Sequence, residues 1–241
     1  MNPKIYAMIP ARYGSTRLKM KNLALINGKP MISYAIQASK SSGVFDRVIV
    51  NSENKIFEKI SQRYGCDFYL RPTSLGSSQA KSDSVIYDFM RNYNMADIVA
   101  WINPIAPFQT QDEISEVINF FLKNNLDSLI TVENKQVHCL FKGIPVNYDK
   151  EDLFAQTQDL EPVQPFVYSI MMWKTEVFMR NFAKKGHALF CGNFNVFPVR
   201  KRTELIIKTQ EDLLFADLLM RTLENSNDDL SLKYDEIIDA N

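Results

Sequence analysis

The sequence contains few of the residues that build metal clusters and disulfide frameworks. Its 241 residues include 3 cysteines and 2 histidines. Cys66, Cys139 and Cys191 lie far apart and form no C-x-x-C pair, so we expect reduced thiols and neither a disulfide framework nor a zinc site. His138 and His187 are too few to complete a metal cluster. These scarcities exclude the class of small domains stabilised by disulfides or zinc.

The sequence also lacks an excess of either charge and any long apolar run. Lys plus Arg equals Asp plus Glu at 28 each, so overall charge gives no reason to expect nucleic acid or an anionic membrane as a partner. No apolar run reaches the ~20 residues of a membrane-spanning helix, and no basic and apolar leader precedes the first strand-like run. We therefore expect a cytoplasmic protein with no nucleic-acid or membrane partner, in which any anion site comes from local clustering of cations.

Short apolar runs alternate with amphipathic stretches over the first 135 residues. This alternation is typical of βαβ units on a mostly parallel sheet, and 241 residues suffice for the core of one α/β domain. Strands are expected at 5–9, 47–51, 67–70, 98–102, 128–132 and 195–199, and helices at 31–41, 55–64, 82–92, 111–123, 175–184 and 210–223. The predicted organisation is a single domain over residues 1–224 followed by a polar, acidic tail at 225–241.

The pattern changes between residues 135 and 175. Pro145, Pro162 and Pro165 fall among aromatic and β-branched residues that show little helical periodicity. Two interpretations stay open: an excursion of extended strands off the main sheet, serving as a dimerisation arm, or an ordinary long surface loop. Loops of this length are uncommon unless they are functional.

A cluster of cations follows the first predicted strand. The loop over residues 10–22 has the sequence PARYGSTRLKMKN, in which four Lys or Arg residues are interleaved with Gly, Ser and Thr. Open parallel sheets bind ligands at the carboxyl ends of their strands. Gly14 would allow close approach of the backbone, and N–H groups and cations would neutralise phosphate charge. The loop therefore suits a triphosphate, although it is neither a G-x-G-x-x-G nor a Walker A motif, and a merely solvated basic loop is the alternative.

The segment IPARYGSTRLKMKNL resembles the signature loop of the cytidylyltransferases that activate 3-deoxy-ulosonic acids, namely the CMP-sialic acid synthetases and their KDO relatives. The likeness continues in further segments up to about residue 219: NGKPM at 27–31, FDRVIV at 45–50, YLRP at 69–72, NPIAPF at 103–108, DLEPV at 159–163 and TQEDL at 209–213. The resemblance implies a Rossmann-like three-layer nucleotidyltransferase fold. It also implies that CTP and a sugar acid are the substrates, that Mg²⁺ is the cofactor and that the protein is a homodimer.

The resemblance assigns roles to individual residues. Arg12 and Lys21 would hold the triphosphate and stabilise charge on the α-phosphoryl group during attack. The remaining nucleotide-binding positions that it implies are Ala11, Gly14, Ser15, Thr16, Asn22, Arg71 and Asn103. Asn103 and Gln109 would contact the acceptor. From the residues alone, Arg71 could instead cap a turn and Asn103 could bond the backbone beside Pro104.

The carboxylates implied for Mg²⁺ are altered. Where the family has D-x-D-T before its last helix, this chain has Ile206-Ile207-Lys208-Thr209, so Ile206 and Lys208 replace both Asp residues. Glu53 remains as a candidate ligand, because Mg²⁺ prefers carboxylate and phosphate oxygens. Lys208 is either an ordinary solvated charge or an ammonium that takes over part of the metal's role near the phosphates.

Three functions stay open at this point. The first is a transferase that forms a CMP-sugar and pyrophosphate from CTP and a 3-deoxy-ulosonic acid. The second is a non-catalytic relative that binds a nucleotide or nucleotide sugar. The third is a transferase that uses another nucleoside triphosphate or acceptor.

Overall fold

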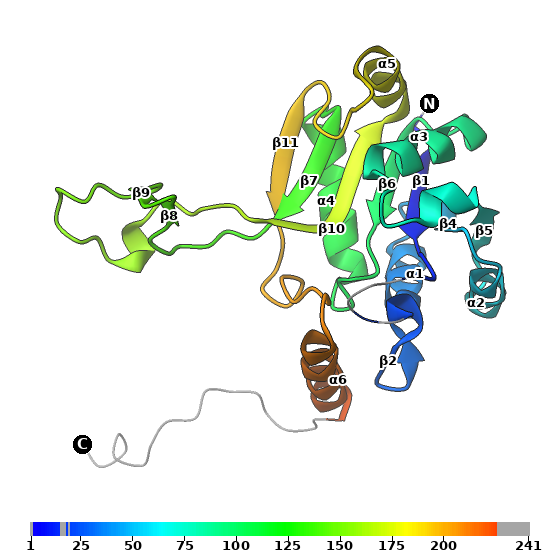
Figure 1. Cartoon of the computed structure of the whole chain (residues 1–241), viewed down its shortest axis with the longest axis horizontal. Coiled ribbons are helices and arrows are strands. Elements are labelled where there is room, and N and C mark those ends of the chain that lie inside the picture. Colours follow the sequence, from blue (N-terminus) through cyan, green and yellow to red (C-terminus); the bar gives the residue numbers. More distant parts are fainter. Residues whose placement is uncertain (1, 15–17, 19, 226–241) are drawn as a thin grey trace.

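The centre of the protein is a twisted, mostly parallel sheet (Figure 1). The computed structural model describes residues 2–14, 18 and 20–225. Within them, a seven-stranded sheet has the order β11-β7-β10-β6-β1-β4-β5. Its strands are β1 (Ile5–Pro10), β4 (Arg47–Ser52), β5 (Asp67–Leu70), β6 (Ile98–Ile102), β7 (Ser128–Val132), β10 (Phe166–Lys174) and β11 (Phe194–Pro198). Only β10 runs antiparallel to its neighbours in this described sheet. The predicted Rossmann-like α/β class is confirmed.

Helices cover both faces of the sheet, which gives three layers. The helices that pack on one face are α1 (Met31–Ser42), α2 (Ile56–Tyr64) and α4 (Gln111–Lys123), and those on the other are α3 (Ser82–Asn92) and α5 (Thr175–Lys185). Because side chains alternate along a strand, Ile5, Ala7 and Ile9 of β1 join the first core while Tyr6 and Met8 join the second. Among the described residues, none of the helices has both the length and the apolar composition that a membrane crossing requires.

A smaller third core lies beyond the carboxyl edge of the sheet. Helix α6 (Gln210–Asn225) packs there against the hairpin of β2 (Leu25–Ile26) and β3 (Lys29–Pro30). Ile207, which precedes α6, is buried with Ile26 and Met31 in this core. The packing brings the end of the domain against the loop that follows β1.

The region predicted as an arm at residues 135–175 divides into two parts. The prediction of strands off the main sheet is wrong for β10, which lies inside the sheet between β6 and β7. Residues such as Ile170 and Met172 are buried in one core and Trp173 in the other, so this apolar segment gains more by entering the sheet than by leaving it.

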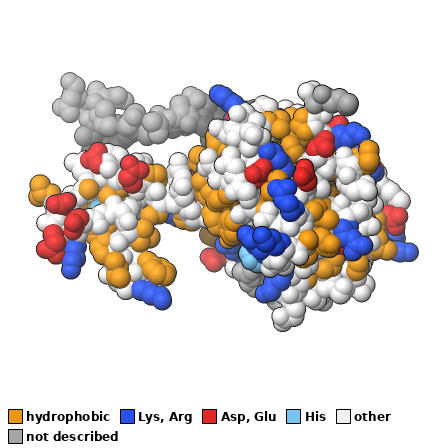
Figure 2. Space-filling model, turned by 90° about the horizontal axis from the view of Figure 1, so that it is seen from above, with side chains coloured by type: hydrophobic (Ala, Val, Ile, Leu, Met, Phe, Trp, Pro, Cys, Tyr) orange, Lys and Arg blue, Asp and Glu red, His pale blue; other side chains and the backbone are white. Residues whose placement is uncertain are grey.

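The remainder does project from the sheet (Figure 1). Backbone bonds between Lys135 and Val163 close its base, and beyond them lie the short strands β8 (Leu140–Phe141) and β9 (Ile144–Pro145) and the 3₁₀ turn η3 (Thr157–Asp159). Hydrophobic side chains are exposed on this projection beside acidic and basic ones (Figure 2). We call residues 133–165 the arm, and its role in dimerisation stays a prediction.

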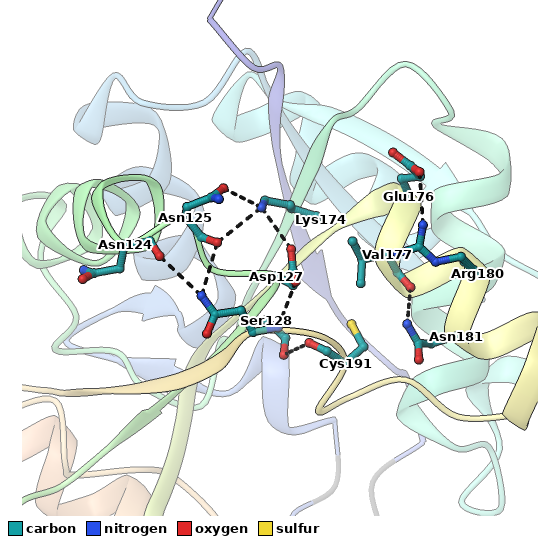
Figure 3. Close-up of polar contacts among 11 residues, drawn as sticks. Asn124, Asn125, Asp127, Ser128, Lys174, Glu176, Val177, Arg180, Asn181 and Cys191 are labelled. Atoms are coloured by element: carbon teal, nitrogen blue, oxygen red, sulfur yellow. Dashed lines mark hydrogen bonds and ion pairs between the residues drawn. The ribbon is translucent and has the colours of Figure 1, made fainter.

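A polar junction ties β7 to β10 at the edge opposite the loop after β1 (Figure 3). Asp127 accepts hydrogen bonds from the Lys174 ammonium at 3.0 Å and from the Asn193 N–H at 2.8 Å. A Cβ atom at Gly192, whose φ is +63°, would lie 2.3 Å from the Asp127 carboxylate, so this turn requires glycine. Burial raises the pKa of Asp127, but the bonds from Asn193 and Lys174 outweigh it and hold that pKa below its ordinary value.

Candidate active site

A cavity of about 230 Å³ opens at the carboxyl ends of β1, β5 and β6. Its lining combines three cations with amide and hydroxyl groups and several apolar side chains: Pro10, Arg12, Lys21, Asn22, Arg71, Leu75, Ser77, Ala80, Ser82, Val85, Trp101, Asn103 and Ile105. Open parallel sheets place ligands at this edge. The structure therefore brings five of the predicted site residues together around one cavity: Arg12, Lys21, Asn22, Arg71 and Asn103.

The loop after β1 is anchored at both of its ends. Ala11 is buried, and its N–H donates to the Asn51 carbonyl at 2.9 Å, which extends the pairing of β1 with β4. The buried Asn22 amide donates to the Arg12 carbonyl at 3.4 Å. Gly14 is exposed, with open space where a Cβ would be. The predicted residues Ser15 and Thr16 lie outside the described part of the chain.

Arg71 braces the two strand ends that support this loop. Its guanidinium donates to the carbonyls of Ala11 and Asn51, each at 3.3 Å, and forms an ion pair with Glu53 at 2.8 Å. Burial lowers the pKa of Arg71 although Glu53 raises it, yet an arginine stays charged at neutral pH. Arg71 therefore braces two strand ends, where the sequence had left a turn-capping role open, and it also lines the cavity.

Glu53 lies behind Arg71 and is committed to structural contacts. One carboxylate oxygen pairs with Arg71, and the other accepts the Tyr13 N–H at 2.7 Å. A Cβ atom at Gly76 would lie 2.4 Å from the Glu53 side chain, so the backbone at Gly76 encloses it closely. The carboxylate proposed from the sequence as a metal ligand thus neutralises Arg71 and holds the loop after β1 in this structure.

Lys21 joins the loop after β1 to the segment before α6. Its ammonium donates to the Ile207 carbonyl at 3.1 Å, and the Ile207 N–H donates to the Ile105 carbonyl at 2.8 Å. Ile105 belongs to the cavity lining, like Lys21 itself. The segment containing Ile206 and Lys208 thus passes directly beside the site, as the resemblance implied.

Asn103 and Gln109 mark the two ends of the loop between β6 and α4. The Asn103 side chain accepts the Ile105 N–H at 3.4 Å, so it braces the turn beside Pro104 and also lines the cavity. Gln109 is placed differently from the prediction. Its side chain is buried and donates to Glu113 at 3.2 Å and to Ser169 at 3.3 Å, and it is not part of the cavity lining. Gln109 therefore holds the loop between β6 and α4 in place, because its buried amide bonds Glu113 and Ser169.

Eight of the thirteen lining residues were not among the predicted site residues, and three of these eight carry polar side-chain atoms: Ser77, Ser82 and Trp101. Ser77 and Ser82 reach the site because the crossover from β5 to α3 passes over the carboxyl end of β1. Their sequence signals are weak: Ser77 follows a predicted strand, and Ser82 begins a predicted helix. Trp101 lies within the apolar run of β6, and nothing in the sequence distinguishes it from a core aromatic residue.

The residues near the cavity do not fit a magnesium ion held by protein carboxylates. Asp212 accepts the N–H groups of Lys208 and Thr209, each at 2.8 Å, and so caps α6. Burial raises the pKa of Asp212, but these bonds outweigh it and place that pKa below its ordinary value. Ile206 offers no donor atom and Lys208 is an exposed cation. Within the described residues, no three His, Cys, Asp or Glu side chains gather into a group that could hold a metal.

Comparison with known families agrees with this geometry. The family model described as "Cytidylyltransferase" matches residues 6–161, which include the loop after β1 and all five predicted residues at the cavity. The chain belongs to the cytidylyltransferase family.

Two relatives are named as cytidylyltransferases of N-acylneuraminate and of pseudaminic acid. The N-acylneuraminate cytidylyltransferase of Streptococcus agalactiae serotype V is 25% identical over 236 residues, covering 92% of this chain and 56% of its own length. The pseudaminic acid cytidylyltransferase of Campylobacter jejuni is 25% identical over 243 residues, covering 92% of this chain and 99% of its own length. The chain thus spans only 56% of the streptococcal relative but nearly all of the Campylobacter one.

A solved structure shares the fold. CMP:2-keto-3-deoxy-manno-octonic acid synthetase, complexed with CTP, superposes with a TM-score of 0.71 at 17% identity, covering 91% of this chain and 99% of its own. At this identity the likeness shows the fold alone.

Proposed function

We propose that this protein transfers CMP from CTP to a 3-deoxy-ulosonic acid of the sialic-acid or KDO type, releasing pyrophosphate. The observation that carries the proposal is the convergence of Arg12, Lys21 and Arg71 on one cavity at the carboxyl edge of the sheet. Three cations with amide and hydroxyl donors suit a triphosphate. The relatives named for N-acylneuraminate and pseudaminic acid support a sugar acid as the acceptor.

The proposed chemistry needs positioning and charge stabilisation more than titrating groups. A hydroxyl of the sugar acid attacks the α-phosphorus of CTP, the bond from that phosphorus to the bridging oxygen breaks, and pyrophosphate leaves while the hydroxyl proton passes to solvent. Arg12 and Lys21 stabilise the charge that develops on the phosphoryl oxygens. Asn22 and Asn103 supply hydrogen bonds that orient the nucleotide and the acceptor.

Magnesium remains part of the proposal only as a companion of the nucleotide. Mg²⁺ binds phosphate oxygens and commonly keeps few protein ligands. Because Glu53 and Asp212 are committed elsewhere, any ion would arrive on the oxygens of CTP. A cytoplasmic location follows from the same proposal, since CTP is available there.

We also propose a homodimer formed through the arm. Phe141 and Ile144, at the β8–β9 hairpin, are 67% and 68% exposed. Exposed apolar side chains that form a contiguous patch mark protein–protein interaction surfaces. A second copy of this chain is the partner that the family resemblance implies.

The first test is nucleotide binding. Arg12→Ala and Lys21→Ala should each weaken CTP binding about tenfold or more, because a hydrogen bond to a charged group contributes roughly 1.5–3 kcal/mol. Arg180→Ala, which removes an exposed cation of α5, is the matched control and should leave the affinity unchanged. Unaltered binding by both site variants would defeat the proposal.

The second test separates turnover from binding. The replacement of both family carboxylates by Ile206 and Lys208 favours, as the competing function, a relative that binds a nucleotide without turnover. Pyrophosphate release from CTP with a panel of ulosonic acids, with and without Mg²⁺, decides between them. Binding without any release would support the non-catalytic relative. Thermal shifts with the four nucleoside triphosphates would identify another base preference.

A further inference from the structure

An irregular segment connects the last sheet strand to the last helix and forms part of the site's frame. Residues 199–209 lie between β11 and α6 without helix or strand. Within this segment, the Ile207 carbonyl accepts the Lys21 ammonium and the Ile207 N–H bonds Ile105. A segment without a ladder of backbone bonds needs other anchors to hold its position.

Glu113 provides such an anchor from inside the domain. It is 1% exposed, one carboxylate oxygen accepts the Arg200 N–H at 2.6 Å, and the other accepts the Thr203 hydroxyl at 2.6 Å. A buried carboxylate is costly unless hydrogen bonds compensate it, and short bonds to a charged acceptor are the strong ones. Two of the bonds to Glu113 hold one end of the irregular segment.

Glu113 lies at a helix position where a glutamate commonly bonds its own helix end, but here its carboxylate bonds a distant segment. Thr110 caps α4 by accepting the Glu113 N–H at 3.2 Å, so Glu113 occupies the third helical position. In a capping box a glutamate here turns back to the N-cap N–H. The Glu113 carboxylate points across to Arg200 and Thr203. The sequence T-Q-D-E therefore begins the helix and also clamps a distant segment.

The same carboxylate is linked through Gln109 and Ser169 to a residue of the cavity lining. Gln109 donates to Glu113 at 3.2 Å and to the Ser169 hydroxyl at 3.3 Å. The Ser169 carbonyl accepts the N–H of Asn103, a lining residue, at 2.8 Å. One buried network thus links the segment that contacts Lys21 with the loop that carries Asn103.

We propose that Glu113 is a positioning residue for the transfer reaction: by clamping residues 199–209 it sets the Ile207 carbonyl, and through it the Lys21 ammonium, against the triphosphate. The proposal rests on the proposed function. Glu113 touches no substrate. Its contribution is geometric, and displacement of a catalytic group by about 1 Å can cost about a hundredfold in rate.

Glu113→Ala should lower kcat about tenfold to a hundredfold. Glu113→Gln keeps an oxygen that can accept the Arg200 N–H and should recover most of that loss. Glu58→Ala is the control, because Glu58 is an exposed acidic residue of α2 that lies outside this network. Its kcat should equal that of wild type. All rates are measured on folded protein and by release of labelled pyrophosphate, which detects slow variants.

A double-mutant cycle with Lys21→Gln separates positioning from general stability. If Glu113 acts through Lys21, Glu113→Ala should reduce kcat less than about threefold once Lys21 is already replaced. Additive losses would overturn the proposal, and so would unchanged hydrogen exchange at the Ile207 N–H in Glu113→Ala. Should that variant not fold, Thr203→Val removes one anchor with little change in shape, and its loss of kcat should also vanish in Lys21→Gln.

The outcomes distinguish the two proposals. Wild-type protein that neither binds CTP nor releases pyrophosphate would overturn the proposed function and, with it, the proposed role of Glu113. Active wild type with additive losses would overturn the role of Glu113 alone.

Discussion

The guanidinium of Arg71 lies 2.8 Å from the carboxylate of Glu53, with side chains only 4% and 12% exposed. Arg71 lines the cavity, and its guanidinium fixes the ends of β1 and β4 through the Ala11 and Asn51 carbonyls. A buried charge of this kind is stable only while its partner remains.

Glu53→Gln should therefore destabilise the protein strongly. Removing one partner of a buried ion pair typically costs about 3–5 kcal/mol, because the other charge stays buried without compensation. Denaturant midpoints measure the loss. The control is Asp67→Asn, which breaks the exposed pair with Arg47 and should cost less than about 1 kcal/mol. Similar midpoints for the two variants would contradict the structural role of Glu53.

Lys208→Asp should make pyrophosphate release more dependent on Mg²⁺. The segment holding Lys208 runs beside the cavity through the Lys21–Ile207 contact, so a carboxylate there would add an oxygen ligand of the type Mg²⁺ prefers. Rates titrated with Mg²⁺ should show a half-maximal concentration lowered about tenfold, or ~1.4 kcal/mol. An unchanged titration would mean that Lys208 faces solvent and has no part in the charge balance.

Asp127→Asn should remove part of the protein's stability at neutral pH but little of it in acid. The pKa of Asp127 is lowered in the folded state, so its contribution is present above the unfolded value of about 3.9 and is lost as pH falls through the folded pKa. The measurement is the difference in denaturant midpoint between wild type and variant at pH 7 and near pH 3. A difference that stays constant over this interval would show that the junction in Figure 3 does not depend on the Asp127 charge.

Replacing apolar arm residues by charges should prevent dimerisation. Phe141→Glu together with Ile144→Glu should sediment as a monomer where wild type sediments as a dimer, because burying unpaired charges in an interface costs several kcal/mol. Leu218→Glu, at an exposed apolar position of α6, is the control and should leave the wild-type state unchanged. A wild type that is monomeric at all concentrations would refute the proposed dimer.

Local pattern was enough to predict most of the fold. Strands such as Ile5–Pro10 and Ser128–Val132 are almost entirely buried and are flanked by amphipathic helices, so both their existence and their parallel arrangement followed from periodicity. The position of the strand Phe166–Lys174 inside the main sheet was not predicted, because a segment rich in aromatic and β-branched residues forms strands equally well on or off that sheet. Only the burial of this strand between the two cores determines that it lies inside the main sheet.

The sequence by itself determined the cationic loop after β1, since its cations and small residues follow the first strand directly and parallel sheets bind ligands there. The tertiary structure alone decided what surrounds that loop. Glu53 pairs with Arg71 and Glu113 accepts the Arg200 N–H, because hydrogen bonds across 18 and 87 residues depend on packing and not on spacing along the chain. Contacts between residues close in the sequence can be predicted from the sequence, whereas the partner of a buried charge depends on the tertiary structure.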